Sequence, residues 1–208
     1  ILDGWGIRET QHGNAVIQGN TPNFDRWMRS GERAIVHTSG EHVGLTPDQM
    51  GNSEVGHLNL GGGRIVNQDI SRIPNAIDDE SLASLDPIQS GIQHIKDSGN
   101  KLHLIGLLGD GGVHSHEDHM YALMDIAKAN GINPVMHVIT DGRDTPTQSG
   151  IEFCRKLVNK IEADGNGRIS TVSGRYYAMD RDKRWQRTHQ AYDAMAFRKS
   201  SPSTNRIA

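Results

Sequence analysis

A serine-bearing segment near residue 50 has the residue types of a phosphoryl-transfer site. The run Gly51-Asn52-Ser53-Glu54-Val55-Gly56-His57 places Ser53 at the expected start of a short helix. Free backbone N–H groups and the helix dipole at such a start stabilise an arriving phosphoryl group. A serine hydroxyl becomes a good nucleophile when a base or a metal ion lowers its pKa. Ser53 is therefore a candidate nucleophile, with simple capping of the helix as the alternative role.

A carboxylate near the start of the chain could share a metal ion with this serine. Asp3 follows two apolar residues and precedes Gly4-Trp5-Gly6, a pattern that predicts the end of a strand and then a turn of small residues. A strand-end aspartate alone is more often a turn former. Together, Asp3 and Ser53 offer oxygen ligands for a divalent cation that would activate the serine.

Two further segments combine arginine with aspartate. Asp141-Gly142-Arg143-Asp144-Thr145-Pro146 follows an apolar run, and Ser173 to Trp185 alternates basic and acidic groups with aromatics. Arginine recognises phosphate or carboxylate through two parallel hydrogen bonds, and a nearby aspartate can accept a proton from a substrate hydroxyl. These segments predict a site for a small anionic molecule, with surface ion pairs as the alternative.

A histidine-rich segment indicates a competing kind of site. His114-Ser115-His116-Glu117-Asp118-His119 has the spacing of the zinc motif of metallo-β-lactamase-like hydrolases. A short pattern of this kind arises by chance in a chain with 11 histidines, and the other ligands of that fold are not evident. We predict one functional histidine, His114, beside solvent-facing His116 and His119.

Composition narrows the class of protein. A formal net charge of −3 over 208 residues gives no bulk basic surface for nucleic acid, and no long apolar run could span a bilayer. The single cysteine, Cys154, excludes an internal disulfide framework and favours the cytosol. Because Cys154 falls on an apolar helix face, we expect it to be buried filler.

The apolar pattern predicts an α/β fold that would bring the polar segments together. Strands are expected at 102–107, 135–139 and 168–172, and helices near 21–31, after Glu117 and over 151–161. Alternating elements of this kind form a parallel sheet with helices on its faces, and ligands bind at the carboxyl ends of its strands. His114, the Asp141 segment and the Gly174–Arg184 segment each follow such a strand end.

Taken together, these segments resemble cofactor-independent phosphoglycerate mutases. The resemblance rests on five blocks in the family order and runs from Ile1 to about Ala194: Leu2 to Gly6, Gln49 to His57, Gly106 to His116, Asp141 to Pro146, and Ser173 to Trp185. It implies an alkaline-phosphatase-like domain interrupted by an inserted α/β domain. Residues 1–67 would be the first piece of the phosphatase domain, 68–194 an incomplete insertion, and 195–208 an atypical, disordered tail.

The resemblance also implies a role for each site residue. Asp3 and Ser53 would bind metal, with two manganese ions in the full-length enzyme and Mg²⁺ or another divalent ion as a substitute. Ser53 would take the phosphoryl group of 3-phosphoglycerate and return it to the other hydroxyl, giving 2-phosphoglycerate without 2,3-bisphosphoglycerate. The glycerate-binding residues would be His114, Arg143, Asp144, Arg175 and Arg181, with Asp144 as the candidate base.

The resemblance leaves alternatives open. In the family most metal ligands and several substrate-binding residues come from the returning half of the phosphatase domain, so we expect a truncated chain that is inactive alone. The alternatives are another metal-dependent phosphomutase or phosphatase of the alkaline phosphatase superfamily, or a non-catalytic fragment that binds phospho-acids. The expected partner is a small-molecule substrate, without nucleic acid or membrane, for a cytoplasmic monomer.

Overall fold

The computed structural model describes residues 1–47 and 49–199 of the chain. They form two compact units, the first from Ile1 to Val66 and the second from Asn67 onward, and each is described here by itself. Among the described residues, no helix combines the length and the apolar character needed to cross a membrane.

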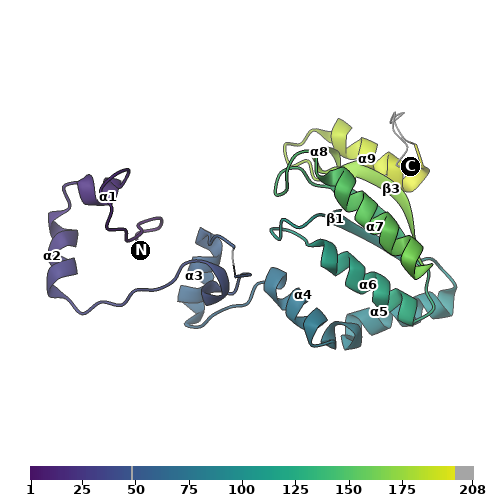
Figure 1. The fold of residues 1–208 in the computed structure, drawn as a ribbon, viewed down its shortest axis with the longest axis horizontal. Helices are drawn as coiled ribbons and strands as arrows, with labels where there is room; N and C mark the ends of the chain where they lie inside the picture. The colour runs from purple at the N-terminus through teal and green to yellow at the C-terminus, as the bar shows by residue number, and fades with distance from the viewer. Residues whose placement is uncertain (48, 200–208) are drawn as a thin grey trace. The chain divides into compact units, whose positions relative to one another are not determined.

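The first unit is built from short helices joined by loops (Figure 1). Its elements are α1 (Ala15–Gln18), α2 (Pro22–Ser30), the 3-10 helix η1 (Gly40–Val43) and α3 (Ser53–Gly62). The predicted helix after Thr21 is confirmed, with proline at its first position, where the missing N–H costs no hydrogen bond. Its buried apolar residues include Val43, Leu45 and Val55, each 4% exposed.

The strand predicted at Ile1–Gly4 is wrong. This segment forms turns, in which Trp5 N–H donates to the Leu2 carbonyl at 3.3 Å and Gly6 N–H to the Gly4 carbonyl at 3.2 Å. A strand needs a neighbouring strand for its ladder of hydrogen bonds, and the described part of the first unit contains none. Asp3 therefore lies in a turn rather than at a strand end.

The second unit is an α/β structure around a three-stranded parallel sheet. The strands are β1 (His103–Leu108), β2 (Val135–Thr140) and β3 (Arg168–Gly174), in the order β1-β2-β3. Its helices are α4 (Asp69–Asp78), η2 (Ser81–Ser84), α5 (Asp86–Ser98), α6 (Glu117–Ala129), α7 (Gly150–Asp164), α8 (Arg175–Ala178) and α9 (Trp185–Phe197). The predicted α/β class and the three predicted strands are confirmed.

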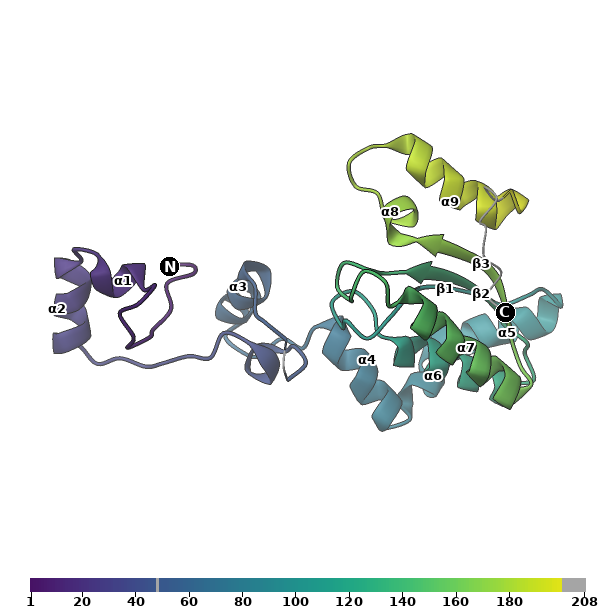
Figure 2. The same cartoon turned by 45° about the horizontal axis from the view of Figure 1, so that its top comes forward.

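The main core lies between the sheet and the helices α6 and α7. Leu104, Leu108, Met136 and Val138 of the strands pack with Met120, Met124, Phe153, Cys154 and Leu157 of the helices. Cys154 is buried filler as predicted, with 2% of its surface exposed. Helix α9 contacts β3 and lies away from α6 and α7 (Figure 2). The core thus fixes the strands whose carboxyl ends carry the polar loops.

The last helix of the second unit overlaps the tail that was predicted to be disordered. The predicted tail begins at Met195, but α9 continues through Phe197. Residues 200–208 lie outside the described residues.

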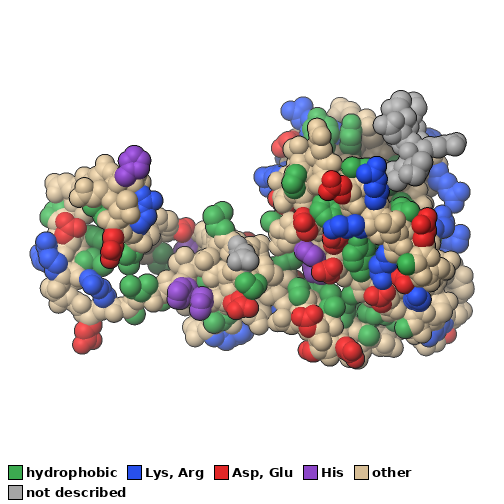
Figure 3. Space-filling view, viewed as in Figure 1, with side chains coloured by type: hydrophobic (Ala, Val, Ile, Leu, Met, Phe, Trp, Pro, Cys, Tyr) green, Lys and Arg blue, Asp and Glu red, His purple; other side chains and the backbone are tan. Residues whose placement is uncertain are grey.

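On the face drawn in Figure 3, Lys and Arg side chains are interspersed with Asp and Glu over the second unit. Ion pairs of this unit include Lys128 with Asp164 and Lys160 with Asp125.

Candidate functional site

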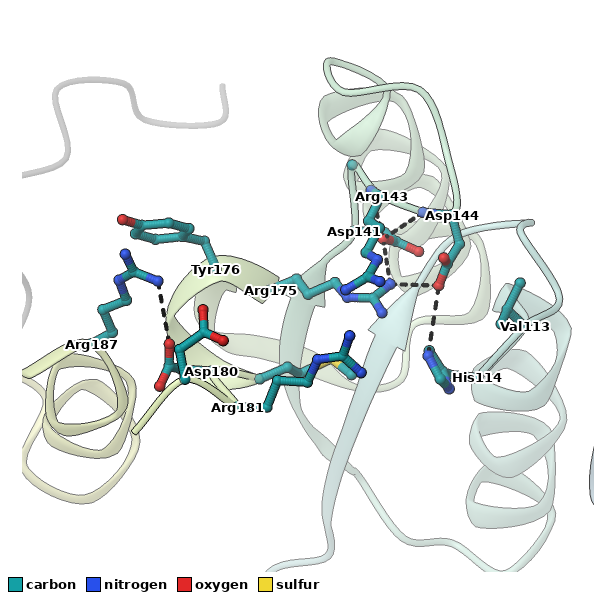
Figure 4. A pocket seen from close by; sticks show the side chains of 13 residues that line it. Val113, His114, Asp141, Arg143, Asp144, Arg175, Tyr176, Asp180, Arg181 and Arg187 are labelled. Atoms are coloured by element: carbon teal, nitrogen blue, oxygen red, sulfur yellow. Dashed lines mark hydrogen bonds and ion pairs between the residues drawn. The ribbon is translucent and has the colours of Figure 1, made fainter. Parts of the chain in front are cut away.

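The loops that follow the three parallel strands converge on one cavity of about 700 Å³ in the second unit. Its lining comprises His114 after β1, Asp141 to Asp144 after β2, and the segment from Arg175 to Asp182, together with Val113 and Arg187. Figure 4 shows the side chains of Arg175, Asp144 and His114 pointing toward one another. All five residues predicted to hold a substrate line this cavity: His114, Arg143, Asp144, Arg175 and Arg181.

Asp141 organises the loop after β2. One carboxylate oxygen, Oδ1, accepts hydrogen bonds from the N–H groups of Arg143, at 2.9 Å, and Asp144, at 3.1 Å. The Thr145 hydroxyl accepts the Gly142 N–H at 3.1 Å and closes the same turn. Aspartate is favoured here because its short side chain can replace backbone partners in a turn. Arg143 and Asp144 are therefore presented to the cavity by a fixed loop.

Arg175 joins this loop to the segment after β3. Its Nη1 lies 2.9 Å from Asp141 Oδ1 and 2.5 Å from Asp144 Oδ2. The side chains of Asp141, Arg175 and Asp144 are only 3%, 11% and 15% exposed, so the pairs are weakly screened by solvent. The hydrogen bond to Asp144 is the main cause of a raised pKa of Arg175. Burial of the guanidinium lowers this pKa, but the bond to Asp141 raises it further. This hydrogen-bonded cluster forms the floor of the cavity.

The pKa of Asp141 lies below its ordinary value for opposing reasons. Burial of the carboxylate raises its pKa, but the N–H groups of Arg143 and Asp144 and the Arg175 guanidinium together outweigh that effect. Asp141 is therefore ionised in the folded chain near neutral pH. His114 faces the same cluster, with its Nε2 4.0 Å from Asp144 Oδ2.

Glycine permits the close approach of two of these loops. A Cβ atom on Gly111, in the loop after β1, would lie 2.6 Å from the carbonyl oxygen of Asp144. Contacts under 3.0 Å are not tolerated by real Cβ atoms. The dense glycine of the Gly106–His116 block thus has a steric role, since any larger residue at 111 would displace Asp144.

A separate cavity of about 550 Å³ lies in the first unit, and its lining includes Asp3, Ser53 and His57. Ser53 is the first residue of α3, as predicted, and Asn52 caps the helix by accepting the Val55 N–H at 3.0 Å. Capping is thus carried out by Asn52, which leaves the Ser53 hydroxyl for another role. Gly51 is required beside it, because a Cβ there would lie 1.7 Å from the Thr38 carbonyl oxygen.

His57 contacts the candidate nucleophile one helical turn away. Its Nδ1 lies 2.7 Å from the Ser53 carbonyl oxygen and 3.3 Å from Ser53 Oγ. A carbonyl only accepts hydrogen bonds, so Nδ1 carries the proton in this arrangement. His57 therefore cannot take a proton from Ser53 through this nitrogen, and the hydroxyl needs another means of activation.

The donors in this cavity partly fit a divalent metal ion. The carboxylate of Asp3 and the hydroxyl of Ser53 are oxygen ligands of the type that Mn²⁺ and Mg²⁺ accept. Within residues 1–47 and 49–199, no group of three or more His, Cys, Asp or Glu is arranged to hold a metal ion. Asp3 and Ser53 thus suit part of a coordination sphere.

The zinc site considered for the His114–His119 segment is contradicted by the same finding, which holds for every described residue. His116 instead caps α6, because its Nδ1 accepts the Asp118 N–H at 3.3 Å. The prediction that His119 faces solvent holds only in part: the residue is half-buried, and its Nε2 is enclosed without a hydrogen-bond partner among the described residues. Burial, and then the charge of His116, lowers the pKa of His119.

Sequence reasoning missed several residues around the cavity. The sequence assigns no role to Asp141 within the Asp141–Pro146 segment, although an aspartate shortly before Gly142 and Thr145 is typical of a side-chain-stabilised turn. Asp180, Arg187 and Tyr176 also line the cavity. Arg187 lies beyond the predicted segment, and nothing in the local pattern indicates its contact with the loop before it.

Comparison with known proteins identifies one family and its members as similar to this chain. The family described as BPG-independent PGAM N-terminus matches residues 73–208, so the match extends past Ala194, where the predicted resemblance ended. A 2,3-bisphosphoglycerate-independent phosphoglycerate mutase from Picosynechococcus sp. is 53% identical over 94% of this chain and 37% of its own length. One from Staphylococcus epidermidis is 47% identical over 94% and 39%.

A solved structure agrees with these relatives. The phosphoglycerate mutase of Leishmania mexicana, studied at low cobalt concentration, superposes with a TM-score of 0.68 and 33% sequence identity. The alignment covers 86% of this chain and 34% of that protein. The chain therefore spans between a third and two fifths of the length of the relatives it matches.

Proposed function

The chain belongs to the family described as BPG-independent PGAM N-terminus, and from this premise we propose that it contributes to the interconversion of 3-phosphoglycerate and 2-phosphoglycerate. The observation that carries the proposal is the convergence of three strand-end loops on a cavity with four arginines and a partly buried Asp141–Arg175–Asp144 cluster. Phosphoglycerate is small and anionic, and such a cavity suits its carboxylate and phosphate.

The proposed division of labour follows from the residues. Arg143 and Arg181 provide positive charge for the anionic substrate, and Arg175 holds Asp144 in place. Asp144 is the proposed base, which accepts the proton of the attacking glycerate hydroxyl. His114, near Asp144, is proposed to donate a hydrogen bond to the glycerate. Retention of the glycerate between the two half-reactions is what separates a mutase from a phosphatase.

Ser53 is the proposed nucleophile. Its Oγ would attack the phosphorus of 3-phosphoglycerate, the bond from phosphorus to O3 would break, and O3 would take up the proton that the serine loses, which gives phosphoserine and bound glycerate. The O2 hydroxyl, whose proton passes to Asp144, would then attack the phosphoserine. The bond from phosphorus to Oγ would break and Ser53 would regain its proton, which gives 2-phosphoglycerate. The free N–H groups at the start of α3 support the phosphoryl group. A divalent ion held in part by Asp3 and Ser53, when bound, would lower the pKa of the serine hydroxyl.

The finer assignments also belong to this proposal. We propose manganese as the preferred ion, an alkaline-phosphatase-like fold for the protein domain that contains residues 1–67, and an inserted substrate-binding domain that begins at residue 68. The division of the structure after Val66 supports that boundary. A cytoplasmic, monomeric enzyme of glycolysis and gluconeogenesis remains a prediction from the family resemblance.

A chimera tests the activity, because the relatives are longer than this chain. Residues 1–194 replace the matching part of the Picosynechococcus relative, and the product is assayed for 2-phosphoglycerate formation with manganese and without 2,3-bisphosphoglycerate. The proposal expects turnover. Release of inorganic phosphate without 2-phosphoglycerate would favour a phosphatase instead. A folded chimera that leaves 3-phosphoglycerate unchanged would contradict the proposal.

A further inference from the structure

The loop that carries Arg181 is held in place by a residue with no role in the mechanism above. Asp180 precedes Arg181, and its side chain is only 2% exposed. Its Oδ2 accepts the Arg184 N–H at 2.8 Å, and its Oδ1 lies 3.2 Å from Arg187 Nη1. One buried carboxylate therefore ties the loop between α8 and α9 to the first turn of α9.

Arg187 extends this connection to α8. Its guanidinium carbon lies 3.7 Å from the centroid of the Tyr176 ring, within the range of a cation–π contact. The planar guanidinium can stack on the ring and still donate to Asp180, which a lysine could not do equally well. Figure 4 shows Arg187, Tyr176 and Asp180 grouped on one side of the cavity, with Arg181 next to them.

The backbone of this loop needs such support. Lys183 has a φ of 59°, in the left-handed region that is unfavourable for a residue with a side chain. A non-glycine residue keeps this conformation when the surrounding contacts determine it. The Asp180 bond to the Arg184 N–H spans Lys183 directly, so the carboxylate closes the strained turn.

We propose that Asp180, Arg187 and Tyr176 are positioning residues that hold the 180–184 loop in one conformation, so that Arg181 faces the cavity ready to bind the anionic substrate. The link to substrate rests on the proposed function. The anchoring of the loop rests on the contacts alone and can be tested without ligand.

Hydrogen exchange on the 208-residue chain tests the anchor. In Asp180→Asn and Arg187→Gln variants, the amides of the 180–184 loop should exchange roughly tenfold faster or more, the effect of losing a hydrogen bond to a charged group. Tyr176→Phe should retain the slow exchange because a phenyl ring still stacks, whereas Tyr176→Leu should lose it. The matched control is Asp69→Asn, which breaks the exposed Asp69–Arg72 pair. Unchanged loop exchange in Asp180→Asn would overturn the proposal.

Binding of 3-phosphoglycerate to the same chain, measured by calorimetry, tests the link to Arg181. Asp180→Asn and Arg181→Gln should each weaken binding roughly tenfold. The double variant should bind about as weakly as Arg181→Gln alone, because Asp180 acts through Arg181. Full additivity, or no loss in Asp180→Asn, would overturn the positioning role. A wild-type chain that does not bind 3-phosphoglycerate would count against the proposed function, while the exchange result would still decide the anchor.

Discussion

Replacement of Arg175 by methionine is the most informative perturbation of the cavity floor. Methionine keeps much of the volume but removes the cation that faces Asp141 and Asp144 at 2.9 and 2.5 Å. Two largely shielded carboxylates would then face each other without the cation between them. Loss of one member of a buried ion pair costs about 3–5 kcal/mol. We expect about 3 kcal/mol at pH 7.5, because Asp144 keeps some solvent exposure.

The cost should depend on pH with a defined sign. In the wild-type chain the pKa of Asp141 is below its ordinary value of 3.8, so its contribution to stability is present above that pH and is lost as the pH falls through the lowered pKa. Without Arg175 the pKa of Asp141 rises, because the guanidinium that lowers it is gone, and the folded variant takes up a proton on mild acidification. The difference between variant and wild type should therefore shrink to roughly 1 kcal/mol near pH 4.

Native-state hydrogen exchange of the β2 amides measures this difference for the second unit without requiring the whole chain to unfold in one step. Arg72→Met, at the exposed Asp69–Arg72 pair, is the matched control and should change stability by less than about 0.5 kcal/mol. A cost below about 1 kcal/mol at pH 7.5 for Arg175→Met, or an equal cost at both pH values, would refute the reasoning.

Three further predictions concern single residues. Burial raises the pKa of the Cys154 thiol, so the native chain should react slowly with a thiol reagent, and rapid native labelling would contradict this. In urea unfolding, Cys154→Ser should lose about 1–2 kcal/mol more of the free energy of unfolding than Cys154→Ala, because it buries a hydroxyl. Burial, and then His103 and Arg168, lowers the pKa of His137. The unfolded chain therefore binds that proton first, stability falls as the pH drops below 6.5, and His137→Gln should reduce the fall seen by β2 exchange between pH 7 and 5. Gly111→Ala should lose about 1–3 kcal/mol of stability and weaken 3-phosphoglycerate binding, because its Cβ would displace Asp144; unaltered calorimetric binding would refute it.

Sequence reasoning found the elements whose signal is local. The apolar runs of β1, β2 and β3 and the helical spacing of α6 and α7 are visible in single segments, and parallel pairing then brings their carboxyl ends to one edge. That is why the five candidate substrate residues could be predicted to lie together. The prediction of a strand at Ile1–Gly4 is wrong because strand formation depends on a distant pairing partner as well as on the segment itself.

The features that the sequence does not reveal depend on tertiary contacts. Arg175 pairs with Asp141, 34 positions away, and no local pattern indicates which of the several carboxylates near an arginine will face it. The burial of His119 has the same origin, since its segment reads as polar while its Nε2 is enclosed. The Asp180–Arg187 anchor likewise depends on how α9 packs beside the loop.

The central claim is that Ser53 carries the phosphoryl group, and mass spectrometry of the chimera tests it most directly. After incubation with 3-phosphoglycerate and manganese and rapid acid quench, the peptide that contains Ser53 should carry a phosphate, and the Ser53→Ala chimera should carry none and lose turnover by roughly a thousandfold or more. Ser39, which lines the same cavity, is the matched control, and Ser39→Ala should leave the Ser53 label in place. An active chimera with no phosphate on Ser53, or with undiminished turnover in Ser53→Ala, would contradict the account.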